Sequence, residues 1–182
     1  MKTLIISTIF ISSFSLSAKA DYNKVNNNLT VIDDTAKQSS LLQLLPLYYD
    51  IENALVNSEA GTAATKAAEF VKTIKSIDMK PLSEHDMNAF MSLEDKLASD
   101  AKHISKSKKI SRQRKHFSSF SVNFYKLAKI VKLTDHIIYY DYCPMKKTYW
   151  LSSEVPIKNP YFGNQMLTCG KIVERIKPRG RK

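Results

Sequence analysis

The residues with the most distinctive chemistry in this sequence are its two cysteines, each of which has a methionine close by. Cys143 is followed by Met145 in the segment CPM, and Met166 precedes Cys169 in the segment MLTC. Thiolates and thioethers are soft ligands that suit monovalent copper or silver, whereas magnesium, calcium and manganese prefer oxygen. If the two segments face each other, they present up to four sulfur atoms to one ion. The spacing therefore indicates a candidate soft-metal site.

The same cysteines also fit a disulfide, because an even number of cysteines in an exported chain most often forms one. Met145 and Met166 would then only fill gaps in the packing. Composition alone favours this alternative over a metal. Neither cysteine lies in the C-x-x-C pair of zinc sites and thiol oxidoreductases or in a cysteine-protease signature. The serines and acids form no convincing catalytic arrangement, so we expect a protein that is not an enzyme.

The first 20 residues have the features of a secretory signal peptide. Lys2 precedes an apolar, serine-rich run, and Ala18 and Ala20 form the A-x-A pattern of a cleavage site. The run is too short to cross a bilayer, which takes about 20 consecutive apolar residues. We expect cleavage near Ala20 and a periplasmic or secreted protein.

The chain is strongly basic, with 28 Lys and Arg against 17 Asp and Glu and a formal net charge of +11. Such a balance often indicates nucleic acid, but export argues against that partner. The basic residues cluster at 102–116 and at the C-terminus, where solvated loops explain them. The alternative is weak attraction to an acidic partner or, as peripheral contact at most, to an anionic membrane.

Hydrophobic periodicity predicts a mainly α fold, an antiparallel four-helix bundle. Residues 21–40 are polar and without periodicity, which predicts a flexible leader. A single domain then spans residues 41–176, with a basic tail at 177–182. Apolar residues three or four apart predict helices at about 45–56, 60–77, 84–104 and 111–133, the third of them capped by Ser83.

The pattern changes at Thr134, after which the chain becomes an aromatic, loop-rich C-terminal tail. The segments HIIYYDYC and KIVERI favour short strands, and VPIKNPYFGN between them is dense in turn-forming residues. We expect Trp150 and the neighbouring tyrosines to attach this tail to the bundle. Both cysteines lie in it.

The segments CPM, YWLS, NPYFG and MLTCG, in this order after a helical region that contains YYDIENALV and QRKHFSSFS, resemble the family known as domain of unknown function 3347. The resemblance covers about residues 45–176. The family is a secreted module that also occurs fused to periplasmic adaptor subunits of heavy-metal efflux pumps, which implies metal handling. The chain differs where KKTYW follows CPM, since the family tends to continue there with a small residue and glycine.

Carried over position by position, the resemblance implicates Cys143, Met145, Met166 and Cys169, with His116 of QRKHF as the imidazole ligand. His116 also fits a core or boundary histidine, because it lies four residues before Phe120. The other three histidines, His85, His103 and His136, are expected at the surface.

The leading hypothesis is a periplasmic module that binds monovalent copper, with silver or zinc as other candidate ions. It would buffer the metal or deliver it to an efflux system, with a periplasmic adaptor protein as partner. The alternative is a structural or protein-interaction domain in which a disulfide between Cys143 and Cys169 pins the tail to the bundle.

Overall fold

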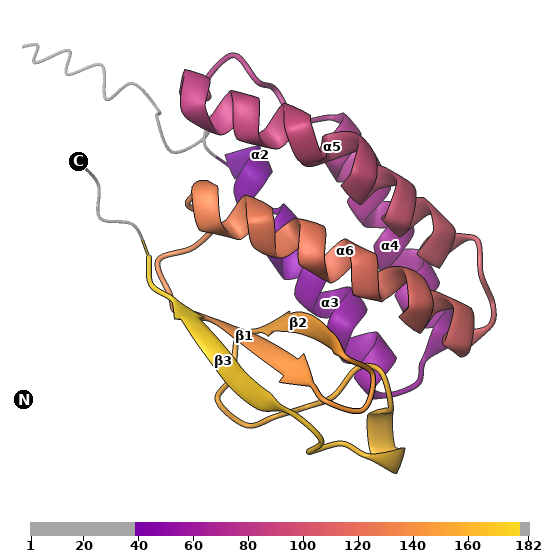
Figure 1. The fold of residues 1–182 in the computed structure, drawn as a ribbon. Helices are drawn as coiled ribbons and strands as arrows, with labels where there is room; N and C mark the ends of the chain where they lie inside the picture. The colour runs from indigo at the N-terminus through magenta and orange to yellow at the C-terminus, as the bar shows by residue number, and fades with distance from the viewer. Residues whose placement is uncertain (1–38, 179–182) are drawn as a thin grey trace, which may run out of the picture. The chain divides into compact units, whose positions relative to one another are not determined.

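Residues 39–178 are described by a computed structural model, and they form helices followed by a small sheet (Figure 1). The elements are α2 (Ser39–Leu42), α3 (Leu44–Val56), α4 (Ala60–Lys75), α5 (Glu84–Ser105), α6 (Ile110–Ile130), β1 (Ile138–Cys143), β2 (Thr148–Ser152), the 3-10 helix η1 (Gly163–Gln165) and β3 (Lys171–Ile176). The predicted signal peptide, most of the predicted leader and residues 179–182 lie outside the described residues. Ser39 and Ser40, assigned above to the leader, begin α2.

Helices α3 to α6 form the predicted four-helix bundle, and each packs against the next one in the chain. Short connections join them, as expected for antiparallel neighbours. Local sequence explains their ends: the Ser83 side chain accepts a hydrogen bond from the Asp86 amide at 3.1 Å and so caps α5 as predicted. Pro46 is tolerated because it lies in the first turn of α3.

Tyr48 of α3 is at the centre of the bundle core and is fully buried. Its ring stacks on three phenylalanines of α6, with centroid distances of 5.4 Å to Phe117, 5.5 Å to Phe120 and 4.7 Å to Phe124. These phenylalanines recur every three or four residues and therefore lie on one face of the helix. The aromatic stripe predicted for this helix is thus its core face.

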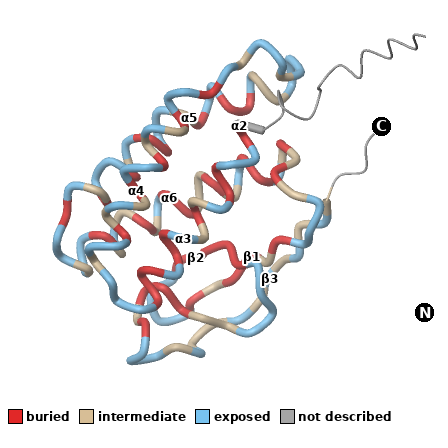
Figure 2. The backbone as a smooth tube through the Cα atoms, turned by 180° about the vertical axis from the view of Figure 1, so that it is seen from behind, coloured by how far each residue is buried: buried red, intermediate tan, exposed pale blue. Residues whose placement is uncertain are grey.

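The tail forms an antiparallel sheet in the order β2-β1-β3. The strands β1 and β3 were predicted. The strand β2 was not predicted, because Trp150, Leu151 and Ser152 are all buried and polar residues do not alternate with apolar ones in it. Figure 2 shows β1 and β2 largely buried, while every residue of β3 is exposed or half-buried.

Hydrogen bonds attach the sheet to the bundle. The Leu151 amide donates to the Tyr48 hydroxyl at 3.0 Å, and that hydroxyl also bonds to Ser121 of α6 at 2.7 Å. The Ser118 and Thr148 hydroxyls bond to each other. These contacts hold β2 against α3 and α6, as expected for the aromatic tail. In residues 39–178 no helix combines the length and apolar character that crossing a membrane requires.

Candidate functional site

The two cysteine side chains lie next to each other at one end of the sheet. Cys143 is the last residue of β1 and is fully buried, and Cys169 is half-buried two residues before β3. Both are free thiols. A hydrogen bond joins the two side chains. The structure therefore brings together the cysteines of two segments that are 26 residues apart in the sequence.

The surroundings of Cys169 act on its ionisation in opposite directions. Burial, together with the adjacent Cys143 and the hydrogen bond to it, raises the pKa of the Cys169 thiol. The backbone amide of Met145 donates to the Cys169 sulfur, which lowers the pKa by a smaller amount. The net effect is a raised pKa, so the thiol is protonated at neutral pH unless a cation displaces its proton.

Asn159 is the buried residue that positions Cys169. Its side-chain amide nitrogen donates to the Cys169 carbonyl at 2.5 Å, and its side-chain oxygen accepts from the Tyr161 amide at 2.8 Å. Its backbone amide donates to the Leu167 carbonyl at 2.8 Å. From its sequence, Asn159 is predicted only as a turn former within NPYFG. The NPYFG motif was the signal for this residue. Its hydrogen-bond partners lie at positions whose contact the sequence alone does not predict.

Gly170 lets the chain pass close to the only tryptophan. A Cβ atom at Gly170 would lie 2.7 Å from Cη2 of Trp150 and 3.2 Å from the Tyr142 carbonyl oxygen, distances that a side chain cannot adopt without displacing the indole or the strand. Glycine next to Cys169 therefore keeps that cysteine against the sheet. Trp150 is fully buried and its ring also contacts Tyr161 of the tail, while its predicted role in attaching the tail to the bundle stays a prediction.

The backbones of both predicted methionine ligands contact Cys169. Met145 donates its amide to the Cys169 sulfur, and the Met166 carbonyl accepts from the Cys169 amide at 3.1 Å. Their side chains are 63% and 38% exposed, respectively. Both methionines are thus exposed, and their backbones lie next to a thiol pair of which one member is fully buried.

His116, the predicted imidazole ligand, lies against α5. Its ring stacks on His103 with centroids 4.5 Å apart, and its Nδ1 is 3.9 Å from an oxygen of Asp100. Burial and the neighbouring His103 lower the pKa of His116. Within residues 39–178 no three residues among histidine, cysteine, aspartate and glutamate are grouped so as to hold a metal ion. The structure therefore does not bring His116 to the thiol pair.

Two buried acids, one in β1 and one in α3, are not among the residues predicted for the site. Asp141 precedes Cys143 by two residues in β1 and is fully buried, and Glu52 of α3 is 4% exposed. Both Asp141 oxygens and the Trp150 indole nitrogen lack a hydrogen-bond partner among the described residues. Burial raises the pKa of Asp141 to about 7, and burial followed by the charge of Asp141 raises that of Glu52 well above its usual range. The available signal for Asp141 in the sequence was its position as an acid within the aromatic segment YYDYC.

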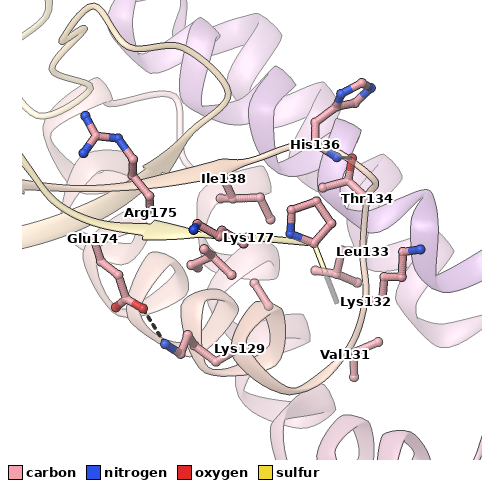
Figure 3. A pocket seen from close by; sticks show the side chains of 13 residues that line it. Lys129, Val131, Lys132, Leu133, Thr134, His136, Ile138, Glu174, Arg175 and Lys177 are labelled. Carbon is pink, nitrogen blue, oxygen red and sulfur yellow. Dashed lines mark hydrogen bonds and ion pairs between the residues drawn. The ribbon is translucent and has the colours of Figure 1, made fainter. Parts of the chain in front are cut away.

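A cavity of about 380 Å³ opens at the other end of the sheet, between the end of α6 and β3 (Figure 3). Two of its basic side chains have acidic neighbours. Glu174 forms an ion pair with Lys129 and accepts a hydrogen bond from Tyr125 at 2.6 Å, and Lys132 lies 2.5 Å from Asp135. His136, expected at the surface, is exposed at its rim. Two of the four lysine and arginine side chains that line this cavity, Lys129 and Lys132, thus have a carboxylate nearby.

Comparison with known families gave one match. The sequence model of the family described as "Protein of unknown function (DUF3347)" matches residues 44–136. These residues are slightly more than half of the chain and comprise α3 to α6 and the loop after them. The motifs around Cys143 and Cys169 lie beyond the matched residues. No curated protein and no solved structure matches the chain.

Proposed function

The chain belongs to the DUF3347 family, and we propose that it binds a monovalent soft metal ion, copper or silver, through the thiolates of Cys143 and Cys169. The observation that carries the proposal is the direct contact between two free thiols, one at the end of β1 and the other in the loop before β3. Two thiolates supply the anionic, polarisable donors that such an ion prefers over oxygen ligands.

The exposed methionines give this thiol pair additional soft donors on its solvent side. Met145 and Met166 are among the large apolar side chains that the structure leaves exposed, and the backbone of each is hydrogen-bonded to Cys169. Flexible thioethers at the surface can receive an ion and pass it to the buried thiolate of Cys143. His116 has no part in this donor set.

The proposed role is that of a non-enzymatic, exported module that buffers the ion or delivers it to an efflux system. The support for export is the signal-peptide pattern of the first 20 residues. The support for delivery is the family resemblance described above, which includes fusion to efflux adaptors. A donor set open to solvent on one side suits transfer better than permanent storage.

A disulfide between Cys143 and Cys169 is the second candidate, and the same contact favours it. Two adjacent thiols in an oxidising compartment can be joined without a large movement of the chain. The oxidised form would pin the tail next to Asn159 and Trp150 and would have no thiolate left for a metal. The two candidates therefore require opposite states of the same sulfur atoms.

Competition with a chelator for monovalent copper tests the metal proposal. We expect the reduced protein to bind the ion in this competition. Replacing both cysteines by serine should lower the affinity more than the roughly 10- to 100-fold that is lost when a residue supporting a metal ligand is removed, because here the ligands themselves are removed. Met145→Leu and Met166→Leu should weaken binding only partly. Affinity should rise between pH 7 and pH 9, because the raised pKa of Cys169 makes proton loss a cost of binding.

Two control variants make this experiment specific. Met91→Leu alters an equally exposed methionine on α5, and His116→Ala removes the imidazole that lies against α5, so neither should change the affinity. Equal competition by the wild type and the double serine variant would defeat the proposal. A second test isolates the protein from its native compartment, with copper supplied and the thiols blocked at harvest. A quantitative disulfide between Cys143 and Cys169 under these conditions would also defeat the proposal.

A further inference from the structure

The larger of the two cavities described here lies between the first turns of α6 and the loop that leads into η1. Its volume is about 580 Å³, within the range of small-molecule sites. Arg114, Lys115 and Ser118 line it from α6, Lys146 from the β1–β2 connection, Thr148 from the start of β2, and Phe162 from the loop. Three cationic side chains therefore converge on one hollow, and none of its lining residues is an acid.

Arg114 is held rigidly at the wall of this cavity by uncharged groups. Its Nε donates to the Pro160 carbonyl at 2.7 Å, and one terminal nitrogen donates to the Leu55 carbonyl at 2.8 Å and to Ser58 Oγ at 2.9 Å. No acid pairs with this guanidinium in the part of the chain that the structure describes. The positive charge is thus fixed in place without an anion of the protein to balance it.

Gly163 shows that the backbone is shaped around Arg114. Its φ is +58°, and a Cβ atom there would lie 2.7 Å from an Arg114 terminal nitrogen and 2.6 Å from the Val56 carbonyl oxygen. Only glycine fits this position without moving the guanidinium or the main chain. The arginine is therefore an ordered part of the cavity wall.

The other two cations of the cavity are also without acidic partners. Neither Lys115 nor Lys146 forms an ion pair with an acid of residues 39–178. The Lys146 ammonium lies 5.2 Å from the centre of the Phe162 ring. In the cavity of Figure 3, by contrast, Lys129 and Lys132 each have a carboxylate nearby. Glu174 lines that cavity, whereas no acid lines the larger one, and this distinguishes the two.

We propose that this larger cavity binds a small organic anion, a carboxylate or phosphate carried on an apolar or aromatic body. The three cations would balance its charge, and guanidinium is well matched to both anions. The bonded hydroxyls of Ser118 and Thr148 add polar contacts, and Phe162 offers an aromatic surface for the body of the ligand. This site requires neither cysteine and is independent of the proposed metal function.

Benzoate and benzamide test the proposal, because they have nearly the same size and differ in charge. Titrations followed by amide chemical shifts should show benzoate binding about tenfold more tightly than benzamide, with shifts at Ser118, Lys146 and Thr148. Raising the salt concentration from 0.05 M to 0.5 M should weaken benzoate binding and leave benzamide unchanged. Phenyl phosphate should bind more tightly than inorganic phosphate, since only the former carries an apolar body.

Variants of the lysines give the matched control. Lys146→Gln should weaken benzoate binding roughly fivefold, the effect of about one kcal/mol from a partly screened charge. Lys147→Gln removes the same charge from the neighbouring residue, which does not line the cavity, and should have little effect. Equal affinity for benzoate and benzamide, equal loss in the two variants, or shifts located elsewhere would overturn the proposal.

Discussion

Buried polar groups are better hydrogen-bonded in the core of the helical bundle than in the interior beneath the sheet. In the bundle, the Tyr48 hydroxyl bonds to both Ser121 and the Leu151 amide. The buried Gln113 donates to the Ala60 and Ser107 carbonyls, each at 2.8 Å, although its side-chain oxygen has no partner among the described residues. Beneath the sheet, both carboxyl oxygens of Asp141 and the indole N–H of Trp150 lack a hydrogen-bond partner among the described residues.

This difference indicates which region of the molecule was optimised for stability. An unsatisfied buried polar group costs about 1–3 kcal/mol, so Asp141 and Trp150 make the sheet region less stable than an apolar version of it would be. Asp141 shares β1 with Cys143, and Cys169 lies just before β3, the strand paired with β1. A region that retains such a cost next to adjacent free thiols is the better candidate for function, while the bundle serves as its support.

Tyr48→Ala should give the largest effect on this comparison. It removes an aromatic ring from the centre of the core, and we expect the free energy of unfolding to fall by about 3–5 kcal/mol in urea denaturation. Tyr48→Phe keeps the ring and leaves the Leu151 amide without its partner, for a loss of about 1–3 kcal/mol. A loss for Tyr48→Phe as large as that for Tyr48→Ala would show that the hydroxyl, and not ring packing, dominates.

The pH dependence of stability should reveal Asp141. Its pKa is about 7 in the folded protein against 3.8 without burial, so the folded state holds the proton more tightly. The stability that this group contributes is therefore fully present below pH 4 and is lost as the pH rises through 7. The loss is about 2–4 kcal/mol when the shift, taken at about 1.4 kcal/mol per pKa unit, is reduced for solvent screening. The raised pKa of Glu52 acts in the same direction.

Unfolding of the wild type and of Asp141→Asn at pH 4.5 and pH 8.5 measures this effect. The variant keeps the shape of the side chain without its charge and should be the more stable protein at pH 8.5, with a smaller difference at pH 4.5. A wild type that gains stability between these pH values, with no benefit from asparagine, would mean that Asp141 is ionised and well solvated in the folded protein.

Glu174→Gln should have the smallest effect, and its pH dependence should have the opposite sign. Hydrogen bonds from Lys129 and Tyr125 lower the pKa of Glu174, so its contribution is present above its ordinary pKa and is lost as the pH falls. For a partly exposed pair joining α6 to β3 we expect about 0.5–1 kcal/mol at neutral pH, measured by thermal unfolding. An undiminished difference at 1 M salt would argue against an electrostatic origin.

The bundle could be predicted from sequence because each of its helices carries its own signal. The phenylalanines of α6 recur at helical spacing, and Ser83 marks the start of α5 whatever the rest of the chain does. The strand β2 lacked such a signal, because Trp150, Leu151 and Ser152 are buried on both faces and do not alternate with polar residues. Local patterns thus sufficed where one face of an element is exposed.

The candidate site was predictable in its residue types but not in its arrangement. The sulfur chemistry of Cys143 and Cys169 follows from their identity, whereas their contact depends on the loop that Asn159 organises. The direction in which His116 points depends on the packing of α6 against α5, which its spacing from Phe120 does not determine. The burial of Asp141 depends in the same way on tertiary structure.

The exposed strand β3 has a consequence for how the molecule behaves at high concentration. It is an outer strand of the sheet, and its sequence KIVERI combines β-branched residues with charges at Lys171, Glu174 and Arg175. An uncovered strand edge can recruit a strand from another molecule and begin aggregation, and charged side chains on that edge oppose such pairing. Pro178, just past the strand, cannot donate a backbone hydrogen bond to extend it. The charges of β3 thus protect the chain from self-association through its sheet.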